Sequence, residues 1–208
     1  NFKELDKIRT KYDYWITPQT PGCVPVPHQR DSICHGRDVY YDKNNKTYIK
    51  IFNPHYIMID NFKEGIESGF LKELAPSLIK LIYDNDQLIG YICKEGKQTP
   101  HTNPDYYSGS PFNENPHSWR YIYKKTKKTE EWLPTHFLNK LKKNCKKYNK
   151  FYFDLTPNNI VQLDDGQYSL IDLEGVYDYN NKGKEELKKH GFGTKPSNLF
   201  EMLDDNRE

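Results

Sequence analysis

Two carboxylate residues and an amide residue flank a short segment of this chain. Asp154 opens the run Asp154-Leu155-Thr156-Pro157-Asn158-Asn159, and Asp172 follows in the run Ile171-Asp172-Leu173-Glu174-Gly175. Phosphoryl transfer uses such oxygen-bearing groups to hold Mg²⁺ and to orient a hydroxyl group. The residue types and their order therefore indicate a candidate site for this chemistry.

The segment between these residues predicts a strand, a tight turn and a second strand. Residues 160–163 are apolar and β-branched, residues 164–167 contain an Asp-Gly pair that favours a turn, and residues 168–171 alternate as a strand does. A hairpin brings its outer ends together, so Asn159 and Asp172 should be neighbours, with Asp154 just upstream. Taken alone, Asp154 and the asparagines could also be ordinary turn residues.

The pattern Asp-Leu-x-x-x-Asn, followed by a hairpin and an Asp, resembles the catalytic loop and metal-binding aspartate of the protein-kinase-like superfamily. The resemblance implies that Asp154 orients the acceptor hydroxyl and accepts its proton. It also implies that Asn159 and Asp172 bind Mg²⁺. The count of residues after Asp154 favours Asn159 over Asn158.

An upstream strand and helix extend the resemblance. Residues 47–52 favour a strand, and its Lys50 resembles the lysine that contacts the α- and β-phosphates of ATP, although an edge-strand lysine is an alternative. Residues 62–74 have apolar side chains at helical spacing and resemble the family's third helix. Its glutamate should form an ion pair with the strand lysine. Glu67 is the expected partner, with Glu64 and Glu73 as alternatives, and a solvated helix residue is the simpler interpretation of Glu67.

The nucleotide-binding side is predicted from two further strands, at residues 78–83 and 88–93, with a hinge at 94–96. The purine of ATP should lie between the strand of Lys50 and the segment 91–94, which makes Tyr91 and Cys93 expected contacts. The phosphate-covering loop of the family matches residues 32–39 only in part. Gly36 is the one glycine there, and its backbone is expected to approach the phosphates.

Other departures narrow the resemblance. Tyr152-Phe153 stands where the family has His-Arg, so control by a phosphorylated activation loop is not expected. The third motif is Asp-Leu-Glu, and Glu174 could face the metal or an acceptor. A helix starting near Pro134 should precede the catalytic loop, because its apolar residues form one stripe. These residues are Phe137, Leu138, Leu141, Cys145 and Tyr148.

Together these elements predict an α+β chain with a two-lobed, protein-kinase-like fold. The N-lobe would be residues 1–95, an irregular lead-in with an antiparallel sheet and one helix, and the C-lobe would be residues 96–208, a reduced helical part with the catalytic loop and the hairpin. Few residues follow Gly175 and no Ala-Pro-Glu motif occurs, so the helices that hold a peptide substrate have no room. The chain therefore resembles small kinases for sugars, lipopolysaccharide core or other metabolites.

Composition limits the partners. The net charge of +2 does not indicate nucleic acid, and no apolar stretch has the length of a membrane span. The four scattered cysteines favour reduced thiols and a cytoplasmic setting. A zinc site is a weaker alternative, because Cys23, His28, Cys34 and His35 lie close in sequence but lack the paired spacing of structural sites. We expect contacts with the acceptor in the proline-rich segment 97–118, at His101, Tyr106, Tyr107 and His117.

We therefore expect an ATP- and Mg²⁺-dependent phosphotransferase that acts on a hydroxyl group of a small molecule or glycan. One alternative is a pseudokinase or nucleotide-binding module without catalysis, because the glycine loop is degenerate and the His-Arg pair is missing. A second alternative is an atypical protein kinase.

Overall fold

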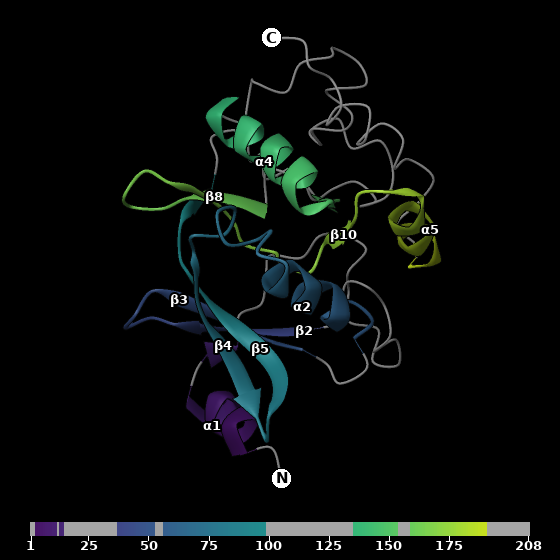
Figure 1. The fold of residues 1–208 in the computed structure, drawn as a ribbon. Coiled ribbons are helices and arrows are strands. Elements are labelled where there is room, and N and C mark those ends of the chain that lie inside the picture. The colour runs from purple at the N-terminus through teal and green to yellow at the C-terminus, as the bar shows by residue number, and fades with distance from the viewer. Residues whose placement is uncertain are drawn as a thin grey trace, which may run out of the picture.

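The computed structural model describes residues 3–11, 13–14, 37–52, 56–98, 135–153 and 159–190, arranged as in Figure 1. Its helices are α1 (Lys3–Lys11), α2 (Ile59–Glu67), α4 (Thr135–Tyr148) and α5 (Asn181–Lys189). Its strands are β1 (Asp13–Tyr14), β2 (Arg37–Asp42), β3 (Thr47–Phe52), β4 (Leu78–Asp84), β5 (Gln87–Lys94), β6 (Lys97–Gln98), β7 (Lys150–Tyr152), β8 (Ile160–Gln162), β9 (Tyr168–Leu170) and β10 (Val176–Asp178). The predicted α+β class is confirmed.

An antiparallel sheet of five strands forms the first half of the fold, in the order β1-β2-β3-β5-β4. The predicted strands at 47–52, 78–83 and 88–93 are confirmed as β3, β4 and β5. Asn85 and Asp86 between β4 and β5 have φ values of 50° and 62°, which suits the tight turn of a two-residue hairpin. β2 differs from the prediction, which places residues 37–39 in the phosphate-covering loop, whereas the structure has a strand there.

The two faces of this sheet bury different residues, because side chains alternate along each strand. One face packs Ile49 and Ile51 of β3 with Ile8 of α1, so α1 covers this face. Figure 1 shows α1 beneath the strands, at the end of the molecule opposite α4. The other face carries Lys50 of β3 and Tyr91 of β5, which are register partners, and it looks toward α2.

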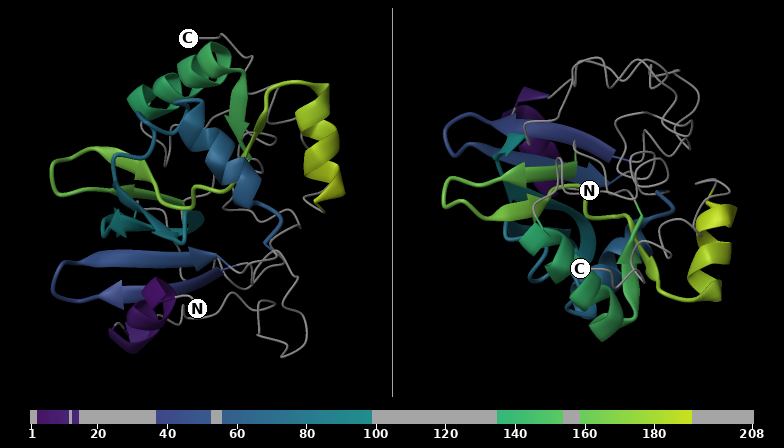
Figure 2. Two further views of the ribbon diagram at one scale, coloured as in Figure 1. Left: turned by 60° about the horizontal axis from the view of Figure 1, so that its bottom comes forward. Right: turned by 90° about the horizontal axis from the view of Figure 1, so that it is seen from above.

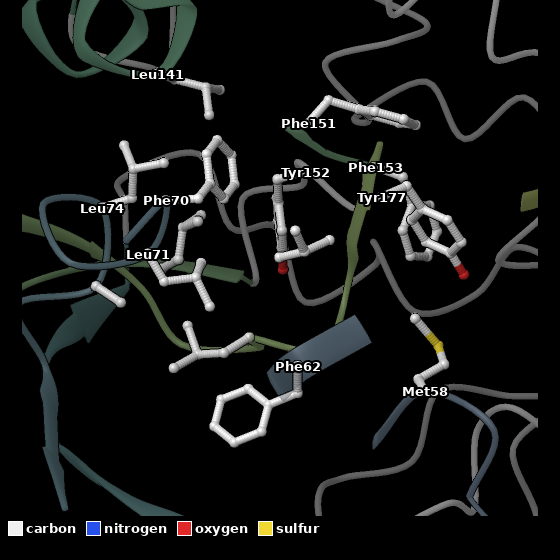
Figure 3. Packing of buried hydrophobic residues seen from close by; sticks show 14 of the residues in the cluster. Met58, Phe62, Phe70, Leu71, Leu74, Leu141, Phe151, Tyr152, Phe153 and Tyr177 are labelled. Atoms are coloured by element: carbon white, nitrogen blue, oxygen red, sulfur yellow. The ribbon is translucent and has the colours of Figure 1, made fainter. Parts of the chain in front are cut away.

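A large core joins that second face to the C-terminal half. Phe62 of α2 packs on Tyr91 of the sheet, and residues of α4 and β7 extend the same cluster. Figure 3 shows Tyr152 among the packed side chains. The fully buried aromatic and aliphatic members include Phe62, Phe70, Leu71, Leu74, Phe137, Phe151, Tyr152, Tyr91 and Tyr177.

The helix predicted at 62–74 is shorter than expected and begins earlier. α2 starts at Ile59 and ends at Glu67, and Gly69 follows with a φ of 82°. A residue in this left-handed region terminates a helix, and glycine adopts it without a steric penalty. Phe70 and Leu71 are nevertheless buried, because the turns after α2 direct them into the core. The apolar pattern of residues 62–74 therefore predicted correctly which side chains are buried, but it did not predict where the helix ends.

The predicted hairpin is confirmed in the second half of the fold. β8 and β9 pair antiparallel, and Gly166 in their connecting turn has a φ of 85°. β6 adds to this hairpin through β8, and β7 pairs with β10 in a separate two-stranded sheet. Figure 2 shows the β8–β9 hairpin and the β2–β3 hairpin extending in the same direction in both views.

α4 confirms the helix predicted after Pro134. Its apolar stripe faces the core: Phe137, Leu138, Leu141 and Cys145 are buried, and Tyr148 is partly buried. Lys143 and Lys146 are exposed, as expected for the opposite face. Of the described helices, none has the length and apolar composition needed to cross a membrane.

Candidate active site

The strand lysine and the aspartate after the hairpin meet in the folded chain. Lys50 Nζ lies 3.3 Å from Asp172 Oδ1 and donates a 2.5 Å hydrogen bond to the carbonyl oxygen of Ile171. These residues are more than a hundred positions apart in sequence. The side chains of Lys50 and Asp172 are only 10% and 19% exposed. The fold thus places an amino group beside a carboxyl group at a position with little solvent exposure.

Buried serines fasten the hairpin that carries Asp172. The Ser77 backbone N–H donates to Ser169 Oγ at 3.0 Å, and Ser77 Oγ donates to the Leu170 carbonyl at 3.0 Å. The Leu170 N–H in turn donates to the Leu74 carbonyl at 2.8 Å. Both serines are fully buried. These bonds tie β9 to the segment before β4, so Asp172 is placed relative to the sheet that carries Lys50.

Asn159 lies at the other end of the hairpin, as predicted. Its carbonyl oxygen accepts a 3.0 Å hydrogen bond from the Ile171 N–H, which brings Asn159 next to the residue before Asp172. The register pair of Ile160 with Leu170 is the reason, because it closes the hairpin at that point. The two residues predicted to bind Mg²⁺ therefore sit at adjacent ends of one hairpin.

The donor chemistry of these residues suits Mg²⁺. Asp172 offers carboxylate oxygens and Asn159 an amide oxygen, and Mg²⁺ prefers oxygen ligands. Within the residues that the structure describes, no group of three or more His, Cys, Asp or Glu side chains could hold a metal by itself. Proteins often bind Mg²⁺ with one or two carboxylates and the phosphates of a substrate. The residues present fit the ion.

The expected ion pair between Lys50 and Glu67 is absent, which corrects the prediction. Glu67 is exposed, and so is Glu64, whose carboxylate lies 3.0 Å from Lys150 Nζ. Phe62 marks the side of α2 that faces the sheet, and Glu67 lies about 140° around the helix from it at 100° per residue. Glu73 is exposed beyond the end of α2.

The expected purine contacts at Tyr91 and Cys93 stay predictions, and they would come from the backbone. Tyr91 and Cys93 are 0% and 1% exposed, so their side chains belong to the core. Both point to the α2 side of the sheet, where Phe62 stacks on Tyr91 with ring centroids 4.7 Å apart. Burial raises the pKa of the Cys93 thiol to about 11, while the Lys50 charge opposes that rise. Cys93 is therefore a core thiol.

Two tyrosines contact the Asp-Leu-Glu motif through their hydroxyl groups, a role that the sequence did not predict. Tyr152 donates its hydroxyl to the Asp172 carbonyl at 2.5 Å. Tyr91 donates its hydroxyl to Glu174 Oε1 at 3.1 Å and accepts from the Leu173 N–H at 3.2 Å. Glu174 is 2% exposed, so it faces the interior. The one signal in the sequence was Tyr152 at the place of the family's histidine.

Several predicted residues lie outside the described part of the chain. These are Asp154, the expected catalytic base, and Gly36, the expected phosphate-loop glycine. The zinc-compatible residues Cys23, His28, Cys34 and His35 and the proposed acceptor contacts at 101–117 also lie outside it. Their predicted roles stay predictions.

Comparison with known sequences finds no match: no protein-family model and no curated protein matches this chain. Comparison with solved structures finds kinases. The chain aligns with the bifunctional kinase-methyltransferase WbdD at 14% identity and a TM-score of 0.39, covering 86% of this chain and 37% of that one. A monomeric form of WbdD gives 12% identity and a TM-score of 0.41, covering 94% and 49%.

Choline kinase LicA from Streptococcus pneumoniae aligns at 11% identity and a TM-score of 0.35, covering 81% of this chain and 76% of that one. The chain thus spans less than half the length of WbdD.

Proposed function

We propose that this protein is an ATP-dependent phosphotransferase that moves the γ-phosphoryl group to a hydroxyl of a small molecule or glycan. The observation that carries the proposal is the 3.3 Å contact between Lys50 Nζ and Asp172 Oδ1. A buried ammonium group beside a carboxylate is the arrangement that phosphoryl transfer needs to hold polyphosphate and metal together.

Each residue of the proposed site has a definite task. Lys50 contacts the α- and β-phosphates, and its place on β3 keeps its charge within reach of Asp172. Asn159 and Asp172 hold Mg²⁺, which supplies neutralisation of the charge that builds up on the phosphates. Asp154 orients the acceptor hydroxyl and accepts its proton. Gly36 lies in the segment that covers the phosphates.

The proposed architecture has two lobes. The N-lobe, residues 1–95, would carry Lys50 on the five-stranded sheet. The C-lobe, residues 96–208, would carry the hairpin with Asn159 and Asp172. ATP would bind where these parts meet, because Lys50 and Asp172 come from opposite sides of that boundary and are in contact.

A thermal-shift titration tests the proposal. Wild-type protein should be stabilised by ATP with Mg²⁺ and not by ATP with EDTA, because a ligand that binds the native state raises its stability. Asp172→Asn should lose the Mg²⁺-dependent part of the shift and all turnover. Asp164→Asn is the matched control, since Asp164 is an exposed carboxylate on the tip of the same hairpin. Loss of the shift in both variants, or in neither, contradicts the assignment.

The acceptor is found by supplying γ-labelled ATP with a panel of sugars, lipids, small alcohols and generic proteins. Transfer to a sugar or small alcohol supports the proposal. Transfer only to proteins supports an atypical protein kinase instead.

A nucleotide-binding module without catalysis is the second candidate, and the absent Lys50–Glu67 pair favours it. Lys50 is instead held by Asp172 and by the carbonyl of Ile171. Under this alternative, Mg²⁺-dependent stabilisation by ATP would occur without transfer to any acceptor and without ATP hydrolysis. Single-turnover measurement with labelled ATP separates the two.

A further inference from the structure

We infer that Tyr91 and Tyr152 are positioning residues that hold the Asp172–Glu174 segment from two sides and align it with Lys50. The inference rests on the proposed function, because alignment matters only if Asp172 and Lys50 act on a nucleotide. Glu67 was expected to hold Lys50, whereas the two tyrosine hydroxyls hold the segment that carries Asp172.

Tyr91 reaches the segment from the sheet. Its hydroxyl makes two hydrogen bonds at once, donating to Glu174 Oε1 at 3.1 Å and accepting from the Leu173 N–H at 3.2 Å. One phenol oxygen therefore fixes both the backbone after Asp172 and the side chain two residues after it. Glu174 is almost fully buried, and a buried polar group without a hydrogen-bond partner costs free energy, so the Tyr91 hydroxyl stabilises the Glu174 side chain in this position.

The ring of Tyr91 is itself held rigidly. It is completely buried, and Phe62 and Phe52 pack on it with ring centroids 4.7 and 5.8 Å away. Lys50 Nζ lies 5.4 Å from the centre of the same ring, within the range of a cation–π contact. The ring therefore touches the lysine while its hydroxyl touches the segment after Asp172. A shift of Tyr91 would move both groups of the proposed site.

Tyr152 reaches the segment from the opposite half of the fold. It lies in β7, is 1% exposed, and donates its hydroxyl to the Asp172 carbonyl at 2.5 Å. The next residue continues the attachment, because the Phe153 N–H donates to the Gly175 carbonyl at 2.9 Å. Tyr152 and Val176 are also register partners of β7 and β10. Figure 3 shows the Tyr152 ring within the main core, which anchors it.

The two tyrosines thus act on consecutive backbone groups. Tyr152 binds the carbonyl of Asp172, and Tyr91 binds the N–H of Leu173, so the same peptide unit is held at both of its polar atoms. That peptide directly follows the side chain proposed to bind the metal. Its orientation sets where the carboxylate points, and a misplacement of about 1 Å at such a site can reduce turnover about a hundredfold.

Three variants that each remove one oxygen atom and keep the ring test the inference. Tyr91→Phe and Tyr152→Phe remove the two proposed contacts. Tyr177→Phe is the matched control, because Tyr177 is equally buried and its hydroxyl bonds His190 Nδ1 at 2.8 Å, away from the segment. ATP turnover is measured across a Mg²⁺ titration at a temperature where all variants are folded by circular dichroism.

Both positioning variants should lower kcat about tenfold or more and raise the Mg²⁺ concentration that gives half-maximal activity, while Tyr177→Phe stays within about twofold of wild type. Amide hydrogen exchange at Leu173 gives a readout that needs no activity. Exchange should be about tenfold faster in Tyr91→Phe than in wild type or in Tyr177→Phe, because the N–H has lost its acceptor. Equal exchange rates of the Leu173 N–H in wild type, Tyr91→Phe and Tyr177→Phe would refute the inference that Tyr91 holds this segment.

The outcomes separate this inference from the proposed function. A wild type that neither binds Mg²⁺-ATP nor turns it over refutes the proposed function. The exchange rates of the Leu173 N–H still decide whether Tyr91 holds the Asp172–Glu174 segment. An active wild type with unchanged kcat and Mg²⁺ dependence in Tyr91→Phe and Tyr152→Phe refutes the positioning role. If Tyr91→Phe does not fold, Glu174→Leu removes the acceptor of the Tyr91 hydroxyl and should shift the Mg²⁺ dependence in the same direction.

Discussion

Removal of the Lys50 charge should destabilise the fold even before any nucleotide is involved. Lys50→Met keeps the length and apolar stem of the side chain and deletes the ammonium group. Asp172 then loses the partner that lies 3.3 Å away, and the Ile171 carbonyl loses its 2.5 Å donor. A carboxylate that is only 19% exposed is left without the charge beside it.

The size of this effect follows from the geometry. Two unit charges 3.3 Å apart attract by about 5 kcal/mol at an effective dielectric constant of about 20, and desolvation of both groups offsets most of this. Removing one partner of a buried pair typically lowers the unfolding free energy by about 3–5 kcal/mol. The partial exposure of Asp172 places Lys50→Met at the lower end, about 3 kcal/mol.

A double-mutant cycle isolates the pair. Urea unfolding, followed by circular dichroism at 222 nm, gives the unfolding free energies of wild type, Lys50→Met, Asp172→Asn and the double variant. The coupling between the two sites should be about 1–2 kcal/mol, so the double variant is more stable than the sum of the single effects predicts. The coupling should persist at about 0.5 M KCl, because salt screens partly buried pairs weakly.

An exposed pair provides the control cycle. Lys7 Nζ and Glu4 Oε1 are 2.6 Å apart, but their side chains are 69% and 47% exposed. Lys7→Met and Glu4→Gln should show no measurable coupling in the same salt. A Lys50–Asp172 coupling below about 0.3 kcal/mol, which is the level of independent sites, would refute the pairing and with it the basis of the proposed site.

Two further predictions concern the sheet next to Lys50. Gly90→Ala should lower the unfolding free energy in urea by about 2 kcal/mol or more, because an added Cβ would meet the Lys50 carbonyl oxygen at 2.0 Å; an unchanged midpoint would contradict this close approach. Burial raises the pKa of the Cys93 thiol from 9.0 to about 11, so the unfolded chain releases this proton first as pH rises. Between pH 9 and 11 the wild type should therefore lose up to about 3 kcal/mol of unfolding free energy relative to Cys93→Ala, and parallel pH profiles would contradict it.

The local elements near the proposed site could be predicted from sequence because their signals are local. A run of strand-favouring residues identified β3, the turn residues at 84–86 separated β4 from β5, and Asp-Gly chemistry identified the β8–β9 hairpin. Because a hairpin has a fixed way of closing, the meeting of Asn159 with the residue before Asp172 followed from the turn alone. No contact from elsewhere in the chain was needed for it.

The partners of Lys50 could not be predicted in the same way. Glu67 was chosen by resemblance to a helix that carries an ion-pairing glutamate, but the side of α2 that faces the sheet carries Phe62. Which face of a helix turns inward depends on the total apolar area that it buries, and here aromatic packing on Tyr91 prevails over one ion pair. The same packing buries the side chains of Tyr91 and Cys93.

The sequence by itself determined the strands β3, β4 and β5, the β8–β9 hairpin and the residue types available for phosphoryl transfer, because residue preference and turn chemistry act over a few residues. The tertiary structure alone decided that Lys50 contacts Asp172 and that Tyr91 and Tyr152 bind the peptide after it. These contacts join segments that are distant in the chain. They depend on which surfaces pack together, and that choice is made by the whole core.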